Sequence, residues 1–285
     1  LEEMKSGGVE PDVISYSAAI SACEKGGRWD RALELLEEMK SSGVEPDVIS
    51  YSAAISSCEK GGQWEQALQL LEEMKSSGIE PNVISYSATI SACEKGGRWD
   101  RALELLEEMK SSGVEPDVIS YSAAMSAFEK GGQWERALAL LEEMKSSGVE
   151  PDVISYNAAI SAFEKGGQWE QALQLLEEMK SGGIEPNVIS YSAAISACEK
   201  GGRWERALEL LEEMKSSGVE PTVISYNATI SACEKGKQWE RALELLEEMK
   251  SGGVEPDVIS YSAAISACEK GGQWERALAL LEEMK

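Results

Sequence analysis

The chain has 285 residues, of which 42% are hydrophobic, and it carries a formal net charge of −24. Its apolar content, with eight tryptophans, suffices for a buried core, and no apolar run approaches the ~18 residues of a membrane span. Histidine is absent, and no Ser/His/Asp or Cys/His set, phosphate-binding glycine loop or repeated metal-ligand spacing occurs. We therefore expect a soluble protein without a membrane partner, enzymatic activity or cofactor.

One unit, running from Val13 to Asp47, returns with small changes every 35 residues. All eight prolines, from Pro11 to Pro256, and the tryptophans from Trp29 to Trp274 keep this spacing. A fixed period of about 20 to 50 residues is typical of a solenoid, whose units bury their apolar faces by stacking on their neighbours. The predicted domain is one array over residues 1–285: the tail of a repeat (1–12), seven full repeats (13–47, 48–82, 83–117, 118–152, 153–187, 188–222 and 223–257) and an incomplete repeat (258–285). Because the sequence starts within a repeat and without an initiator methionine, we expect an excerpt of a longer chain.

Each repeat contains two helical patterns, which we name helix A and helix B. In the first full repeat, helix A is predicted from Val13 to Lys25, with a buried face of Val13, Tyr16, Ala19, Ile20 and Cys23. Gly26 and Gly27 end it. Helix B is predicted from Trp29 to Lys40, with a core-facing stripe of Trp29, Ala32, Leu33, Leu36 and Met39. Glycine and proline follow, as at many helix ends. The fold class is therefore all-α: a solenoid of stacked antiparallel helical hairpins forming a superhelix, with tryptophans such as Trp134 buried between helices.

All six cysteines occupy one slot of the repeat, which Phe128 and Phe163 fill in two other copies. Phenylalanine neither binds a metal nor forms a disulfide. Copies of one slot in adjacent repeats should lie about 10 Å apart, whereas a disulfide needs Cα atoms within about 7 Å. The cysteines are therefore predicted to be small buried hydrophobic residues, and no metal site is expected.

The negative charge is concentrated away from helix A, whose charges sum to zero in the first full repeat. The acids belong mainly to helix B and to the loops, and the adjacent pair Glu37 and Glu38 is predicted to face solvent. Lys25 and its copies end helix A, where the helix dipole favours a positive charge. A nucleic-acid partner is therefore compatible with the acidic composition only on the helix A wall.

A few slots stand out on helix A and just before it. The residue after the tyrosine, the Tyr+1 slot, is Ser or Asn, and the residue after the proline, the Pro+1 slot, is Asp, Asn or Thr. The Pro+1 residues are all good N-caps, so capping alone accounts for them, although they also supply hydrogen-bond donors and acceptors for a base edge. Ile14 and its copies form an apolar ladder on a polar wall. Two interpretations are open: each isoleucine packs against the neighbouring hairpin, or flat rings such as bases stack between successive isoleucines.

The repeat resembles the pentatricopeptide repeat (PPR) family over all 285 residues. The resemblance is carried by the 35-residue period, the Tyr-Ser or Tyr-Asn pair, the EKGG turn, the RALELLEEMK helix and the GVEPD close. The 34-residue tetratricopeptide repeat differs in period and in the placement of Trp, Gly and Tyr. This chain departs from the usual PPR pattern at Trp29 and its copies, where an aliphatic residue is more common, and at Lys237, which replaces a turn glycine.

The resemblance implies single-stranded RNA as the partner, with one nucleotide bound per repeat. It implies base recognition by the Tyr+1 and Pro+1 slots, namely Ser17, Asp47, Ser52, Asn82, Ser87, Asp117, Ser122, Asp152, Asn157, Asn187, Ser192, Thr222, Asn227, Asp257 and Ser262. It implies that the base is sandwiched by Ile14, Ile49, Ile84, Ile119, Ile154, Ile189, Ile224 and Ile259. It places phosphates near Lys25, Lys60, Lys95, Lys130, Lys165, Lys200, Lys235 and Lys270.

The family's two-slot correspondence also implies a target. Ser with Asp implies G, Ser with Asn implies A, Asn with Asp implies U, and Asn with Asn implies a pyrimidine. Read with the N-terminus toward the 5′ end, the chain is expected to bind 5′-G-A-G-G-(C/U)-N-U-(purine)-3′, because Ser192 with Thr222 does not define a base and Ser262 has no following partner.

An architectural scaffold is the alternative, binding proteins or ribosomal RNA within a large organellar ribonucleoprotein. A groove for peptides should carry long charged or aromatic side chains on helix A, whereas the short polar slots favour bases. The resemblance implies a mitochondrial or plastid location and a role in organelle RNA processing. The sequence does not determine the oligomeric state.

Overall fold

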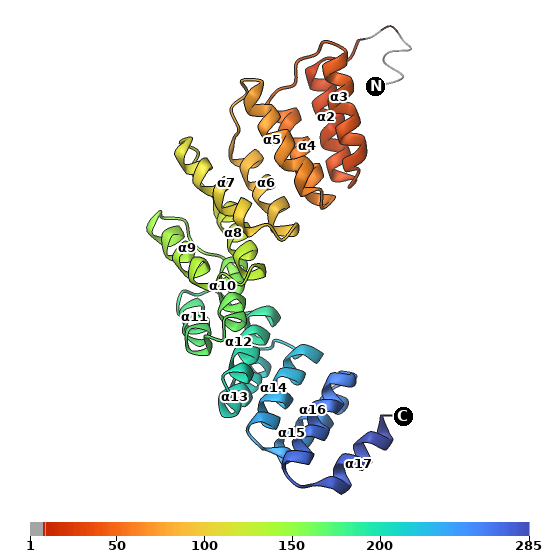
Figure 1. The fold of residues 1–285 in the computed structure, drawn as a ribbon, viewed down its shortest axis with the longest axis vertical. Helices are drawn as coiled ribbons and strands as arrows, with labels where there is room; N and C mark the ends of the chain where they lie inside the picture. Colours follow the sequence, from red (N-terminus) through yellow and green to blue (C-terminus); the bar gives the residue numbers. More distant parts are fainter. Residues whose placement is uncertain (1–7, 9, 285) are drawn as a thin grey trace. The chain divides into compact units, whose positions relative to one another are not determined.

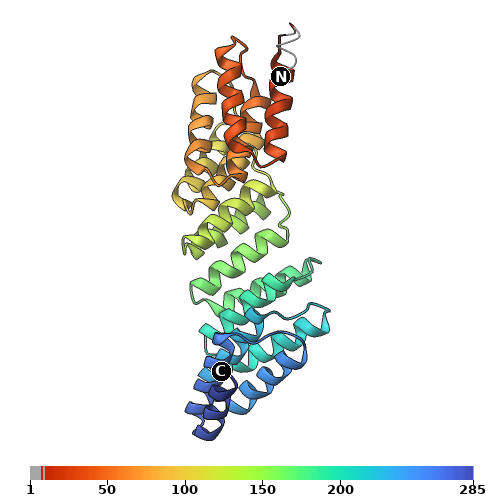
Figure 2. The same cartoon turned by 90° about the vertical axis from the view of Figure 1, so that its right-hand side faces the viewer.

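The computed structural model describes residues 8 and 10–284, so most of the predicted partial repeat 1–12 lies outside the described residues. The described part folds into two compact units, Leu1–Gly131 with Ala139–Glu150 (unit 1) and Gly132–Leu138 with Pro151–Lys285 (unit 2). No strand occurs in the residues that the structure describes. Within each unit, helices A and B alternate and follow one another in chain order (Figures 1 and 2). The all-α class is therefore confirmed.

The helix bounds repeat with the sequence. Unit 1 holds α2 (Val13–Lys25), α3 (Trp29–Ser41), α4 (Val48–Lys60), α5 (Trp64–Ser76), α6 (Val83–Lys95), α7 (Trp99–Ser111) and α8 (Val118–Lys130). Helix α9 (Trp134–Ser146) is divided between the units after Leu138. Unit 2 holds α10 (Val153–Lys165), α11 (Trp169–Ser181), α12 (Val188–Lys200), α13 (Trp204–Ser216), α14 (Val223–Lys235), α15 (Trp239–Ser251), α16 (Val258–Lys270) and α17 (Trp274–Glu283). Helix A has the predicted bounds, and helix B ends one residue later than predicted.

Local signals explain these bounds. The Asp47 side chain accepts a hydrogen bond from the Ser50 backbone N–H at 2.9 Å, and the Asp47 N–H donates to Ser50 Oγ at 2.8 Å, so the start of α4 is capped reciprocally. At the end of α3, Gly43 has a φ of 75°, and the Val44 N–H returns to the Met39 carbonyl at 3.1 Å. This is a left-handed helix ending that glycine adopts without strain.

The core lies between helices A and B of each hairpin and against the next helix A. Helix A buries its tyrosine and cysteine slots, such as Tyr51 and Cys58, as predicted. Helix B buries Ala32, Leu35, Leu36 and Met39 and their copies, except in α17, where only Leu280 is buried. The sequence pattern therefore missed the Leu35 slot, while the predicted Leu33 is only half-buried. A helix B that packs against two successive helices A needs a wider apolar face than the predicted stripe.

The prediction of fully buried tryptophans is wrong, because Trp134 and the other internal tryptophans are half-buried. Trp134 lies 5.7 Å from Phe163, measured between ring centroids. Each ring lies across the junction with the next repeat, where it covers the first glycine of that repeat's turn. A Cβ added to Gly166 would lie only 2.4 Å from Cδ1 of Trp134. The indole thus seals a repeat junction at its edge, and the absence of a side chain on the glycine makes room for it.

Helix B also contains a network that the sequence did not reveal. Glu73 accepts a hydrogen bond from the Tyr51 hydroxyl at 2.8 Å and forms an ion pair with Lys40 of the preceding repeat. The lysine Nζ lies 5.7 Å from the centroid of the Tyr51 ring. Glu73 is the copy of Glu38, so the prediction that both acids of the pair simply face solvent is wrong for this slot, whereas Glu37 is exposed. The contact links three helices and depends on the stacking of repeats.

Candidate nucleic-acid interface

The isoleucine ladder is exposed on helix A. Between 58% and 73% of each residue is accessible, for Ile14, Ile49, Ile84, Ile119, Ile154, Ile189, Ile224 and Ile259. Each isoleucine is the second residue of its helix, directly after the residue that follows the N-cap. More than half of each isoleucine is therefore open to solvent, and the ladder offers an apolar surface to a ligand.

The Tyr+1 slot is more enclosed than the polar wall expected from the sequence. Ser17, Ser52, Ser87, Ser122, Asn157 and Ser192 are only 5–8% accessible. Asn227 is half-buried and Ser262 is exposed. This is a correction: the slot lies at the seam between one helix A and the start of the next. Its side chain can therefore act on a ligand mainly through the residue that it contacts across the seam.

That residue is the Pro+1 residue at the end of the same repeat, which caps the next helix A. Ser17 Oγ lies 3.4 Å from Asp47 Oδ1, and Ser87 Oγ lies 3.3 Å from Asp117 Oδ1. The Asn157 amide donates to Asn187 Oδ1 at 3.2 Å. Ser52 with Asn82 and Asn227 with Asp257 make the same contact at 3.5 and 3.0 Å. The structure thus brings together the two slots that the sequence nominated as a pair, although they are 30 residues apart.

Capping of helix A fixes which atom of the Pro+1 residue faces outward. Oδ1 of Asp117 accepts the Ser120 backbone N–H at 2.9 Å, the Ser120 hydroxyl at 2.7 Å and the Ser87 hydroxyl. Oδ1 of Asn82 is used in the same way by Ser85 and Ser52. A backbone N–H can only donate, so the amide oxygen of Asn82 must face the helix. The remaining atom, a carboxylate Oδ2 in Asp117 or an amide Nδ2 in Asn82, has no hydrogen bond to the described residues.

The serine three residues after the cap belongs to the same cluster, and the sequence argument did not single it out. Ser85 Oγ lies 3.1 Å from Ser52 Oγ, and Ser190 Oγ donates to Asn157 Oδ1 at 2.6 Å. The serine is fully buried in each case. An Asx-x-x-Ser spacing at a helix start was the available signal, since the third helical residue is where a capping partner belongs.

Two of the cap carboxylates have a lowered pKa. In Asp257, partial burial acts to raise the pKa, but hydrogen bonds from Ser260 and Asn227 outweigh it and hold the pKa below its ordinary value. For Asp12, the hydrogen bond from the Ser15 backbone lowers the pKa. The outward oxygen of Asp257 is therefore a charged acceptor with no proton to donate.

The lysines at the end of helix A lie in ion pairs with the preceding repeat. Lys60 Nζ lies 2.7 Å from Glu24 Oε1, Lys95 Nζ lies 2.5 Å from Glu59 Oε1, and four further copies repeat the contact, at Lys130, Lys200, Lys235 and Lys270. Their side chains remain about two-fifths accessible, for example 42% for Lys95. The sequence nominated these lysines without identifying their glutamate partners, because the two lie 36 residues apart.

Other chemistry is not built into the described surface. No group of three or more potential metal ligands occurs among the described residues, and none of the helices there is long and apolar enough to cross a membrane. The cysteines are free thiols, buried except for the half-buried Cys23. Burial raises the pKa of the Cys58 thiol to about 11, which makes it a poor nucleophile at neutral pH.

Similar folds occur in solved structures of PPR proteins. The maize PPR protein PPR10 is 27% identical with a TM-score of 0.58, over 99% of this chain and 45% of that one. PPR10 in complex with an 18-nucleotide psaJ RNA element is 24% identical with a TM-score of 0.61, over 99% and 46%. The PPR domain of Arabidopsis thaliana protein-only RNase P 1, in complex with tRNA, is 18% identical with a TM-score of 0.54, over 59% and 89%. The chain therefore spans less than half the length of the PPR10 chains.

Family models give the same assignment over the entire sequence, whereas no curated protein matches it significantly. The pentatricopeptide repeat domain model matches residues 1–62, 35–98, 69–131, 104–166, 139–203 and 174–237. Two further PPR repeat models match residues 221–270 and 259–285. With its period, its hairpins and these matches, the chain belongs to the pentatricopeptide repeat family.

Proposed function

We propose that the chain binds single-stranded RNA, with one nucleotide per repeat and a preferred target of 5′-G-A-G-G-(C/U)-N-U-(purine)-3′. The observation that carries this proposal is the contact between the Tyr+1 and Pro+1 slots beside an exposed isoleucine ladder. RNA in the complexes of PPR10 and of the RNase P domain supports the ligand class. A mitochondrial or plastid location remains part of the proposal by family resemblance.

The outward atom of the Pro+1 residue accounts for the choice of base. Asp117 presents a carboxylate oxygen, which accepts the imino N–H on the Watson–Crick edge of guanine or uracil. Asn82 presents an amide N–H instead, which donates to the ring nitrogen of adenine or cytosine. The Tyr+1 residue then separates purine from pyrimidine through its size, since serine leaves more room beside the cap than asparagine.

The isoleucines supply the second part of the contact. An apolar side chain on the first turn of each helix A offers a flat base an apolar surface next to the outward cap atom. Ile84 and Ile119 are 59% and 61% accessible, so a base between them would remove apolar surface from water on both of its faces.

The lysine pairs modulate phosphate binding. Lys95 must loosen its contact with Glu59 before a phosphate gains its full charge, so each such phosphate contact should be weaker than one with an unpaired lysine. This arrangement lowers sequence-independent affinity relative to base recognition, which is consistent with an acidic protein that binds RNA.

The decisive experiment exchanges the outward atom without changing the cap. Asp117→Asn keeps Oδ1 for Ser120, as Asn82 does for Ser85, so the fold should be unaffected. Binding is compared on two RNAs that differ only in G or A at the third position. The variant should shift preference from G to A by about 1–3 kcal/mol, which is about 5- to 150-fold in affinity.

Asn82→Asp is the matched reciprocal variant and should shift the second position from A to G. If both proteins prefer the same RNA as the original chain, or if none distinguishes the target from a scrambled strand, base recognition by these slots is wrong.

A further inference from the structure

The wall formed by helices B in unit 2 is open, because these helices are spread apart. Successive helices A, such as α10 and α12, are in close contact through their small alanine and serine side chains. No Cα atom of α11 comes within 8 Å of one in α13, and the same holds for α13 with α15, all three being fully described. Side chains rather than backbone therefore line the spaces between successive helices B.

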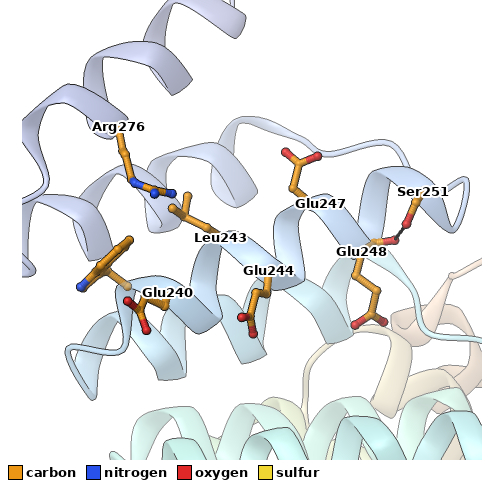
Figure 3. A pocket seen from close by; sticks show the side chains of 8 residues that line it. Glu240, Leu243, Glu244, Glu247, Glu248, Ser251 and Arg276 are labelled. Atoms are coloured by element: carbon orange, nitrogen blue, oxygen red, sulfur yellow. Dashed lines mark hydrogen bonds between the residues drawn. The ribbon is translucent and has the colours of Figure 1, made fainter.

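These spaces are grooves of one repeated design. The groove between α15 and α17 has a volume of about 750 Å³, the one between α13 and α15 about 480 Å³, and the one between α11 and α13 about 410 Å³. Each contains the tryptophan that starts a helix B and the leucine one turn later, such as Trp239 and Leu243. Figure 3 shows Leu243 and Glu247 on the side of α15 turned toward Arg276, which extends from α17. An apolar floor is thus present in three consecutive grooves.

Glutamates outnumber arginines on the rims of two of these grooves, whereas two glutamates and two arginines line the groove between α11 and α13. Four glutamates and one arginine line the groove between α15 and α17, and five glutamates and one arginine line the groove between α13 and α15. Most of these acids are in ion pairs. Glu209, Glu212, Glu244 and Glu247 pair with a base of their own helix, and Glu248 pairs with Lys215 of the preceding helix B. Glu205 and Glu240, at the tryptophan end of each groove, are exposed and make no ion pair or hydrogen bond with any described residue. The grooves therefore favour a cation with an apolar portion.

The fold contains its own example of such a cation. The Arg203 guanidinium lies 4.6 Å from the centroid of the Trp169 ring, and Arg276 lies 5.1 Å from that of Trp239. At the intervening groove the residue that corresponds to Arg203 is Gln238. The residue that corresponds to Arg276 is Arg241, which lines this groove but pairs with Glu244. Among the described residues no cation covers the Trp204 ring, which stands beside Glu205 and Glu209. An arginine from outside could occupy Trp204 as Arg203 occupies Trp169.

We propose that the helix B wall of unit 2 binds a cationic amphipathic segment of a partner protein, with an arginine of that segment on Trp204. Charge complementarity selects this occupant: nucleic acid and a second copy of this chain, which carries a net charge of −24, are both repelled by the rims. Three successive grooves, each with a tryptophan and a leucine, suit an extended polypeptide better than one small ligand. The surface uses none of the residues proposed to face RNA.

Synthetic peptides and three single variants of the full chain test this, each variant adding one positive charge unit. Gln238→Arg should cover Trp204 with the chain's own guanidinium, and Glu205→Gln removes a rim acid. Glu220→Gln, in the loop before α14, is the charge-matched control. The probe is a short arginine–leucine peptide, measured by calorimetry at about 0.15 M salt beside an arginine–serine peptide of equal charge.

We expect the arginine–leucine peptide to bind at least tenfold more tightly than the arginine–serine peptide. Gln238→Arg and Glu205→Gln should each weaken its binding about tenfold, which is the effect of losing a single hot-spot residue. Glu220→Gln should change its binding less than about twofold, within the small effect of a remote exposed charge. The proposal is overturned if the leucine peptide shows no saturable binding, if both peptides bind alike, or if all three variants weaken binding equally, which indicates non-specific charge attraction. Retained circular dichroism excludes unfolding as the cause of a loss.

Discussion

Alanine at Gly201 should destabilise the solenoid, whereas alanine at Gly26, in the same slot of the first full repeat, should stabilise it. Both glycines follow a helix A, and their φ angles of −77° and −84° suit alanine. They differ in their neighbours, because Trp169 of the preceding repeat lies against Gly201, and no tryptophan atom lies within 4 Å of a Cβ built on Gly26.

The magnitude follows from the distances. A Cβ on Gly201 would lie 2.5 Å from Cδ1 and 2.6 Å from Cγ of Trp169. Carbon atoms pack best about 3.5–4.0 Å apart, so the indole or the backbone must move by about 1 Å. Overpacking of this kind typically costs about 1–3 kcal/mol, against a gain of about 0.4–1 kcal/mol from the lower entropy of the unfolded chain. We expect a net loss of about 1–2 kcal/mol at Gly201.

At Gly26 the nearest atoms to an added Cβ are the backbone oxygens of Ala22 and Cys23, at 3.4 and 3.7 Å. Neither distance requires a substantial shift, so only the entropic gain of about 0.4–1 kcal/mol remains. The two substitutions are chemically identical, and their effects should have opposite signs.

Urea denaturation followed by circular dichroism measures both effects as shifts in the midpoint. Hydrogen exchange of α2 and α12 amides adds a local measurement, because repeats can unfold in part. In the double variant Trp169→Leu with Gly201→Ala, the cost of the alanine should shrink, which gives the coupling energy of the pair. If Gly201→Ala stabilises the chain as Gly26→Ala does, the indole does not lie against this glycine and the proposed sealing of repeat junctions is wrong.

Lys237 holds the left-handed conformation (φ 58°) that glycine occupies at this turn in other repeats. Lys237→Gly should therefore raise the free energy of unfolding by about 1–2 kcal/mol, and an unchanged urea midpoint would show that the lysine backbone is not strained. Glu59 pairs with Lys95, so Glu59→Gln should release the lysine for a phosphate and raise RNA affinity. The slope of log K against log salt concentration should become steeper by about 0.7. RNA titrations at several salt concentrations measure this slope, and identical curves would show that Lys95 contacts no phosphate. Burial raises the pKa of Cys198 to about 11, whereas Cys23 is half-buried. Iodoacetamide should therefore alkylate Cys23 first, as measured by peptide mass spectrometry. Equal alkylation rates would mean that the internal thiols are accessible.

The sequence by itself determined the period, the all-α class and the bounds of the helices. Helix A runs from Val13 to Lys25 as predicted, because its start and end are set by neighbours in the chain: a capping aspartate or asparagine before it and glycines after it. The ladder of isoleucines and the pairing of the Tyr+1 and Pro+1 slots were likewise identifiable, since few slots break the helical pattern or vary between otherwise similar repeats.

Only the tertiary structure decided what each residue contacts in the next repeat. Trp169 lies on Gly201, Lys95 pairs with Glu59, and Glu73 joins Tyr51 to Lys40 of the preceding repeat. The partners in these contacts are 22 to 36 residues apart along the chain. Their meeting depends on how far one hairpin is shifted and rotated on the next, which is set by the packing of small side chains between helices A and is not encoded in the pattern of any single helix. The grooves likewise form between helices B of successive repeats, which are far apart in the chain.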